Sequence, residues 1–252
     1  MRSVARLVAR PDGRGGTRLT ELAGEPPLLL RQTGHRDGVA EVYVVGAAAG
    51  PLAGDDLRLE VEVTAGAAVR VHTVAASVAL PGRPGAGRSR MSVRARVAAG
   101  AALHWLPEQT VAAAGCAHHA ESWVELAEGA VLTWRDELVC GRYAERPGDA
   151  VVGTYVDHAG APLLRQSLAV GPTAPGWDGA AVLGGAVATG SLLLVRPGRV
   201  AGPPWVHPDG TVARLPLAGG PADLWTATAP DAHLLRELLS PVDADPPGRS
   251  GP

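Results

Sequence analysis

Three potential metal ligands lie close together in the middle of the chain. Cys116, His118 and His119 fall within four consecutive positions. On a strand, Cys116 and His118 point to one side and His119 to the other, so only two of them can face one ion. Because a tetrahedral or square-planar metal site needs more ligands than two, the segment predicts either a weak, transient metal contact or histidines at a solvated strand edge.

Two pairs of adjacent carboxylates are the next candidates for chemistry. Asp136 and Glu137 follow a tryptophan and an arginine. Adjacent side chains on a strand project to opposite faces, whereas the two carboxylates of a glycosidase converge on one bond. The pair therefore predicts a salt-bridged strand edge. Asp55 and Asp56 follow Gly54, which predicts a turn where an Asp side chain caps backbone amides.

The familiar catalytic motifs are missing from the sequence. It contains no G-x-S-x-G, no P-loop, no H-E-x-x-H and no G-x-G-x-x-G. Their absence favours a binding or assembly role over catalysis.

The strands that would position these residues are indicated by an internal repeat. Each copy has a run of alternating apolar and polar residues, a short turn that ends in Gly-Ala, and a second alternating run. The copies are LEVEVTAGA at 59–67, VRARVAAGA at 93–101, SWVELAEGA at 122–130 and a weaker one that ends at 159–161. This pattern predicts two half-buried strands per copy, with Gly66, Gly100, Gly129 and Gly160 supplying the positive φ of the turn.

The repeat predicts the fold class. Repeats of about 30 residues that contain strands and no helical crossover are typical of stacked β structure. We therefore predict a single mainly β domain over residues 1–242, stacked as a β-solenoid; a layered β-sandwich is the alternative.

The alternation in the second strand of each copy also predicts which side chains share a face. The third and fifth residues after each Gly are apolar and should be buried: Val69, Val71, Leu103, Trp105, Leu132 and Trp134. The fourth and sixth should form a polar face toward solvent or a partner: Arg70, His72, His104, Leu106, Thr133 and Arg135.

Helix is expected only near the C-terminus. Residues 232–239 are helix formers preceded by Pro and Asp and followed by Pro241, which predicts a short helix. A second short helix is expected around 222–227. Residues 243–252 are rich in Pro, Gly and Asp and predict a flexible tail.

Composition excludes several classes of protein. The 252 residues include 33 Gly and 22 Pro, which argues against long helices. The net charge is −2, with both signs interspersed, so the basic surface of a nucleic-acid binder is missing. Two cysteines without C-x-x-C spacing fit a reducing compartment. No long apolar run or signal-peptide pattern occurs, so we predict a cytoplasmic protein without a membrane segment.

Five segments in order carry a resemblance to a known family. They are PLLLRQ at 27–32, GPLAGDDL at 50–57, TVAAS at 73–77, LHWLPEQTV at 103–111 and WRDELVCGR at 134–142. Across about residues 25–145 their order and spacing resemble the urease accessory protein UreD (UreH) family. The chain departs from the family pattern at Pro51, Ala53, Val78 and Gln109, as a divergent member would.

The resemblance implies a chaperone rather than an enzyme. Family members have a single stacked, β-rich fold, bind apo-urease and UreF, and through UreF the GTPase UreG, in assemblies often built on paired copies. They assist nickel insertion into urease, and a proposed role is to pass nickel along a polar internal route. This implies no tightly bound cofactor, with nickel only transiently present.

The matched motifs imply a set of functional or scaffold-critical residues: Asp55, Thr73, Ser77, Asp136, Glu137 and Arg142. For Thr73 and Arg142, a buried hydroxyl and a buried guanidinium that hold the strand stack together are an equal alternative. Cys116, His118 and His119 lie outside the motifs and stay weaker metal candidates.

Two other functions remain open at this point. One is a carbohydrate-active β-solenoid enzyme that uses Asp136 or Glu137 as acid or base. The other is a protein-interaction scaffold that needs no metal.

Overall fold

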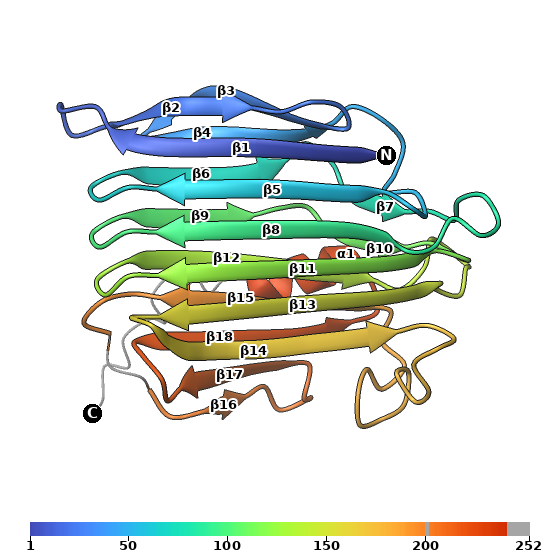
Figure 1. The fold of residues 1–252 in the computed structure, drawn as a ribbon. Helices are drawn as coiled ribbons and strands as arrows, with labels where there is room; N and C mark the ends of the chain where they lie inside the picture. Colours follow the sequence, from blue (N-terminus) through green and yellow to red (C-terminus); the bar gives the residue numbers. More distant parts are fainter. Residues whose placement is uncertain (200–201, 241–252) are drawn as a thin grey trace.

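The computed structural model describes residues 1–199 and 202–240, which form two facing β-sheets and one helix (Figure 1). Sheet A has seven strands in the order β14-β13-β11-β8-β5-β1-β2. Their bounds are β1 (Arg2–Pro11), β2 (Thr17–Ala23), β5 (Asp56–Val63), β8 (Ser89–Val97), β11 (Ala117–Leu126), β13 (Asp149–His158) and β14 (Ala161–Val170).

Sheet B has eleven strands, nine of them in the order β16-β17-β18-β15-β12-β9-β6-β4-β3. The bounds are β3 (Leu28–Arg36), β4 (Val39–Gly46), β6 (Ala68–Thr73), β7 (Ser77–Ala79), β9 (Ala102–Leu106), β10 (Thr110–Ala112), β12 (Val131–Val139), β15 (Ala188–Val195), β16 (Trp205–Val206), β17 (Val212–Leu217) and β18 (Ala222–Ala229). The short strands β7 and β10 pair with each other beside β12.

The chain winds between the two sheets as a solenoid of about four turns. Each coil places one strand in sheet A, turns a corner and places the next in sheet B. Successive coils pair in parallel. In sheet A the pairs are β1–β5, β5–β8, β8–β11 and β11–β13, and in sheet B they are β4–β6, β6–β9 and β9–β12. The predicted β-solenoid is confirmed, and the alternative of a layered sandwich is not.

Three of the four predicted Gly-Ala turns are the corners of the solenoid. Gly66, Gly100 and Gly129 have φ of 78°, 66° and 79°. The alanine after each glycine is buried in the core, and its N–H donates to the carbonyl three residues earlier. The repeat in the sequence therefore corresponds to one coil of the structure.

The fourth copy of the repeat makes a different turn. Ala159 and Gly160 both have positive φ, 50° and 81°, and join β13 to β14 as an antiparallel hairpin within sheet A. Two consecutive residues with positive φ are typical of a type I′ hairpin turn, which reverses the chain instead of carrying it to the other sheet. The parallel stacking of sheet A ends at this hairpin.

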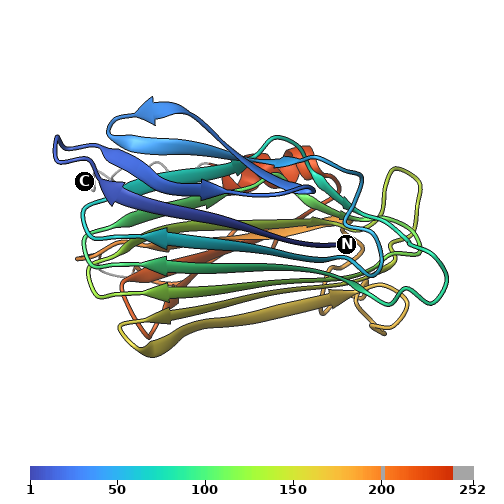
Figure 2. The same cartoon turned by 45° about the horizontal axis from the view of Figure 1, so that its top comes forward.

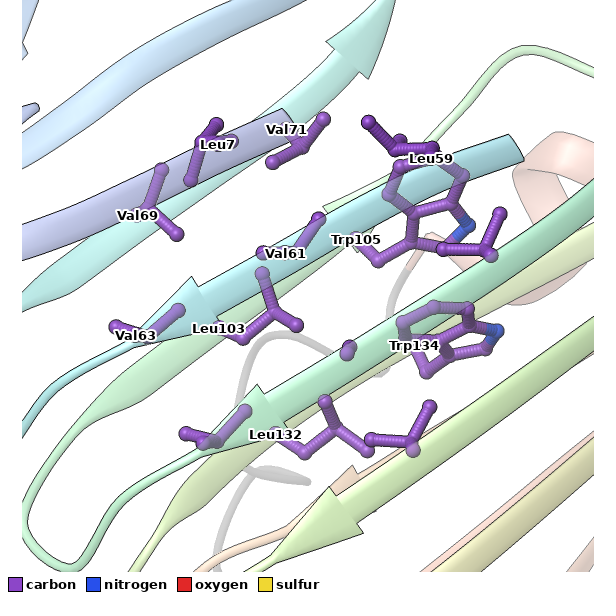
Figure 3. Close-up of a cluster of buried hydrophobic side chains, with 14 of the residues drawn as sticks. Leu7, Leu59, Val61, Val63, Val69, Val71, Leu103, Trp105, Leu132 and Trp134 are labelled. Atoms are coloured by element: carbon purple, nitrogen blue, oxygen red, sulfur yellow. The ribbon is translucent and has the colours of Figure 1, made fainter. Parts of the chain in front are cut away.

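The core lies between the sheets, on the side of the corners (Figure 3). All six residues predicted to be buried after the glycines are buried, and Trp105 stacks on Trp134 with ring centroids 5.2 Å apart. The residues predicted to form the polar face lie on the outside of sheet B. Arg70 and His72, for example, both pair there with Glu41.

The C-terminal part contains one helix rather than two, within the residues described up to 240. The helix α1 (Ala232–Leu239) is the predicted one, and the Asp231 side chain caps it by accepting from the Leu234 N–H at 2.8 Å. The other segment predicted as helix, around 222–227, is the strand β18, which pairs with both β15 and β17. Strand pairing on both sides outweighs the weak helical preference of its sequence. The predicted flexible tail, 243–252, lies outside the described residues.

The helix packs on the outer face of sheet B against β15 and β18, through Leu235 and Leu239. The loops that follow β7, β12 and β14 gather at the end of the strands opposite the glycine corners (Figure 2). This loop end is where the core changes from apolar to polar.

We predict that Gly100→Ala destabilises the protein by about 1–2 kcal/mol, because a side chain in the left-handed region costs that much. Nothing lies within 4 Å of a Cβ built on Gly100, so the cost comes from the backbone conformation and not from a clash. Thermal or urea unfolding measures it. The control is Gly46→Ala, where the space is equally open and φ is not positive. Equal stability of the two variants would contradict the assignment of the corner.

Candidate functional site

A cavity of about 280 Å³ lies between the two sheets at the loop end. Its walls include inner side chains of both sheets together with the segments 46–51 and 73–77. The polar residues that line it are Asp55, Thr73, Ser77, Glu108, Thr110, His118, Glu121, Ser122, Asp136 and Glu137.

The cavity exists because the inner side chains of the strands change character along their length. On β11, the inward residues near the corner are Val124 and Leu126, whereas toward the loop end they are His118, Ala120 and Ser122. Small and polar side chains fill less space than the leucines and tryptophans of the core. A polar hollow therefore remains between the sheets.

Asp136 directs its carboxylate into this cavity, where the residue is partly buried. It lies on the inner face of β12, and its Oδ2 accepts from Trp134 Nε1 at 3.0 Å and from Thr154 Oγ1 at 2.5 Å. Thr154 belongs to β13 in sheet A, so this contact links the two sheets. Burial raises the pKa of Asp136 above its ordinary value, and these two hydrogen bonds oppose the rise. Among the described residues, no cation lies within salt-bridge distance of it.

His118 contributes an imidazole to the same cavity. Its Nδ1 lies 2.9 Å from Ser89 Oγ, and both residues are buried. Burial, with a smaller effect of the neighbouring His119, lowers the pKa of His118 to about 4. The ring is therefore neutral near pH 7, which is the form that ligates metal ions.

The other two predicted metal candidates point elsewhere. His119 is on the outer face of sheet A, where its Nε2 lies 2.9 Å from Glu121 Oε1. Cys116 is buried in an apolar cluster with Leu138 and Cys140, and burial raises the pKa of its thiol to about 11. Within the residues that the structure describes, no three His, Cys, Asp or Glu side chains are arranged to hold a metal ion.

Glu137 faces away from Asp136, as expected for adjacent strand residues, and fastens the helix α1 to sheet B. Arg236 of α1 donates through Nε and Nη2 to both carboxylate oxygens of Glu137 at 2.7 Å. It also donates to Glu108 at 3.2 Å. The hydrogen bonds that Arg236 donates to Glu137 raise the pKa of Arg236, so it remains charged. The predicted salt-bridged edge is correct for Glu137 and wrong for Asp136.

Asp55, Thr73 and Ser77 fix the loops that line the cavity. Asp55 accepts from the Met1 ammonium group at 2.7 Å and from the Leu52 N–H at 2.9 Å, which confirms the predicted capped turn. The Thr73 hydroxyl donates to the Ala75 carbonyl at 3.0 Å and accepts from the Glu108 N–H at 2.9 Å. Four of the six motif residues, Asp55, Thr73, Ser77 and Asp136, thus line one cavity, whereas the side chain of Glu137 points away from it.

Arg142 is the exception among the motif residues. It is exposed, does not line the cavity, and forms a two-fold hydrogen bond with Glu145 in the loop after β12, at 2.9 and 2.6 Å. The hydrogen bond from Arg142 lowers the pKa of Glu145 to about 2. The expectation of a buried guanidinium that holds the strand stack together is wrong, because the chain leaves the sheet before this residue.

Sequence reasoning missed the residues that complete the site. Ser89, Ser122 and Thr154 share the inner face with residues that were recognised, and polar residues at inward positions of an alternating strand were the available signal. Arg236 carried no such signal, because it lies 99 positions from Glu137 in the chain.

Comparison with known proteins gives consistent similarities. A family model described as UreD urease accessory protein matches residues 2–241. A protein of Streptomyces griseus named urease accessory protein UreD 3 is 50% identical over 242 residues, which cover 95% of this chain and 94% of the relative. UreD proteins of Streptomyces avermitilis and Frankia alni are 46% and 44% identical; the first alignment covers 95% of both chains, the second 93% of this chain and 89% of the relative. No helix in the described part of the chain has the length and apolar character to cross a membrane.

We predict that Asp136→Asn stabilises the protein at pH 7 by about 1 kcal/mol or more, because Asn keeps an acceptor and removes a buried charge. The pKa of Asp136 is raised in the folded state. Its contribution to the free energy of unfolding is therefore fully present below the ordinary pKa of 3.8 and is lost as the pH rises through the raised pKa. The advantage of the Asn variant should therefore grow from pH 4 upward in thermal unfolding. An advantage that is independent of pH would contradict this.

We further predict that Arg236→Gln costs about 3 kcal/mol, because it leaves the fully buried Glu137 carboxylate without its main partner. Glu108→Gln should cost less than about 1 kcal/mol, since that carboxylate is partly exposed. In urea unfolding, the double variant Arg236→Gln with Glu137→Gln should lose less than the two single losses combined. Additive losses would show that the pair does not hold the helix.

Proposed function

We propose that this chain, which belongs to the UreD family of urease accessory proteins, is a non-catalytic chaperone that assists nickel insertion into urease. Membership of that family supports a role in urease maturation. The finer role proposed here is to give nickel a polar route through the interior of the solenoid toward urease.

The observation that carries the proposal is the polar cavity between the sheets. Asp55, Thr73, Ser77 and Asp136 come from three separate motifs of the sequence and all line it. Carboxylate and hydroxyl oxygens with one neutral imidazole, His118, are donors that a divalent cation accepts. In the described part of the chain, these donors do not gather into a site of three or more, and such dispersed contacts suit passage better than storage. We therefore propose transient nickel contacts and no resident cofactor.

The partners that the proposal requires are those of a maturation complex. We propose that the chain binds the urease apoprotein and UreF, and UreG through UreF, in the cytoplasm and as paired copies. A cation that travels inside the solenoid must enter from one protein and leave to another, so the cavity is useful only within such a complex.

The alternative of a carbohydrate-active enzyme is not supported by the geometry. Asp136 points between the sheets and Glu137 points out toward α1, so the two carboxylates do not converge on one bond. Glu137 is moreover held by Arg236 and is fully buried. A scaffold that needs no metal is distinguished by experiment, because it predicts that substitutions in the cavity have no effect on the nickel content of urease.

The experiment is deletion of the gene followed by complementation. The deletion strain should contain urease that is synthesised but poor in nickel and inactive. Complementation with Ala120→Phe, which places a bulky ring in the cavity from β11, should leave urease poor in nickel, whereas Ala117→Phe on the opposite face of the same strand should restore it. Nickel in purified urease is measured by atomic absorption, after circular dichroism has shown both variants folded.

Two outcomes would overturn the proposal in different ways. Normal nickel content of urease in the deletion strain would end the maturation role itself. Full complementation by Ala120→Phe would leave the maturation role and refute the internal route, in favour of a scaffold. Since filling the cavity costs about 1–3 kcal/mol at most sites, a melting curve of the variant is part of the experiment.

A further inference from the structure

An aromatic pair stands on the outer face of sheet A, on the far side of that sheet from the cavity. Trp123 on β11 and Tyr155 on β13 are direct neighbours in the parallel register. Their rings stack with centroids 4.3 Å apart and planes inclined by 21°. Trp123 is 44% exposed, in a chain whose aromatic content is only 4%.

The position of the pair is fixed by Gly153, two residues before Tyr155 on β13. A Cβ built on Gly153 would lie 2.9 Å from Tyr155 Oη and 3.0 Å from its Cε2. The Tyr155 ring therefore lies back along its own strand, in the space that a side chain at 153 would occupy. A glycine within a strand often marks such a close approach, and here it holds one ring in place for the other to stack on.

The charged residues around the pair mostly have partners. Glu125 accepts from Arg96 at 3.0 Å, and Asp157 pairs with Arg165. Glu121 pairs with His119. The carboxylates close to the aromatic pair thus already have partners on the same face, two arginines and the His119 ring.

Two arginines on β8 differ from the rest. Arg94 is in register with Trp123, and Arg90 is in register with His119, one strand away. Both are exposed, and neither has a carboxylate within 4 Å among the described residues. The Trp123 indole N–H also has no hydrogen-bond partner in that part of the chain. Asp56 and Glu60 of β5 are in register with Arg90 and Arg94, but among the described residues no carboxylate oxygen comes within 4 Å of either guanidinium. The two arginines and the indole N–H therefore keep donors that this surface does not use.

We propose that Arg90, Arg94, Trp123 and Tyr155 form a docking surface, the Trp123 surface, for an acidic segment of a partner protein. Tryptophan, tyrosine and arginine carry most of the energy in protein interfaces, especially inside a ring of groups that exclude water. The paired charges at Glu121, Glu125 and Asp157 supply that ring. Two guanidinium groups without carboxylates select for a partner of negative charge. The Trp123 surface is separate from the nickel route and does not depend on it.

The test measures binding of a fluorescein-labelled octaglutamate peptide to the full chain by fluorescence anisotropy, with octaglutamine as the uncharged peptide. Trp123→Thr and Arg94→Gln should each weaken octaglutamate binding about five-fold or more. The matched controls are Trp205→Thr, at a tryptophan that is 43% exposed on sheet B, and Arg88→Gln, at an exposed arginine in a loop. Each control should change the affinity by less than about two-fold.

Gly153→Ala is a further variant that keeps all four side chains and displaces the Tyr155 ring. It should also weaken binding, and it keeps the proposal falsifiable if Trp123→Thr does not fold. Equal losses in the test variants and their controls would mean unspecific charge attraction and would overturn the proposal. Unchanged binding in the test variants, or equal affinity for octaglutamine, would overturn it as well.

A second copy of the chain is the competing occupant. Sedimentation at rising protein concentration would reveal a dimer that Trp123→Thr dissolves and octaglutamate does not. That result would assign the Trp123 surface to self-association and overturn the acidic partner.

Discussion

Parallel pairing between successive coils is the constraint on which the rest of the structure depends. Because β5, β8, β11 and β13 pair in parallel without a shift in register, equivalent residues of successive coils form continuous columns across the sheet. One inner column consists of Val61, Ala95, Val124 and Val156, which are all apolar. A neighbouring column runs from Leu59 and Val93 to Ser122 and Thr154. The paired strands cannot move to fill the space where the side chains of a column become small and polar. The cavity therefore follows from the register.

The columns also explain why polar groups can persist inside a core. Thr154 ends the column that begins at Leu59, and it meets Asp136 from the opposite sheet. A buried carboxylate with hydrogen bonds but no cation costs stability, and an apolar residue of similar size would remove that cost. That cost is not recovered inside the cavity, where no cation of the described residues pairs with Asp136. The adjacent residue, Glu137, instead binds the helix through Arg236 on the outside of the same strand. Strand β12 therefore carries a destabilising group on one face and a strong attachment on the other.

How far the sequence predicts this structure depends on whether the relevant interaction is local. The corners at Gly66, Gly100 and Gly129 and the buried positions after them follow from alternation and a glycine turn, both of which are local. The turn at Gly160 has the same local signature but is a hairpin, because Ala159 also takes positive φ there, and no sequence feature distinguishes the two. The strand β18 forms between two partners far away in the chain, so its composition pointed to helix instead.

The same distinction applies to the candidate site. The motif residues were found because their segments resemble a family, and four of them converge on the cavity. Neither the resemblance nor the alternation showed that Arg142 leaves the sheet. His118 and His119 were separated correctly, since strand alternation alone decides their faces. The same alternation, followed back from the apolar Val124 and Leu126, also marks the face of His118 as the interior, a step that the sequence reasoning did not take.

The cavity and the Trp123 surface both depend on the register of strand β11. Its inward residues His118, Ala120 and Ser122 line the cavity, while Trp123 points out beside Tyr155. A slip of one residue against β8 would turn Trp123 into the interior and expose the polar lining. The register is held by the apolar end of the strand, where Val124 and Leu126 are buried in the core near the Gly129 corner. The residues that keep both surfaces in place are therefore not those that form them, and the apolar half of each coil stabilises the geometry that the polar half uses.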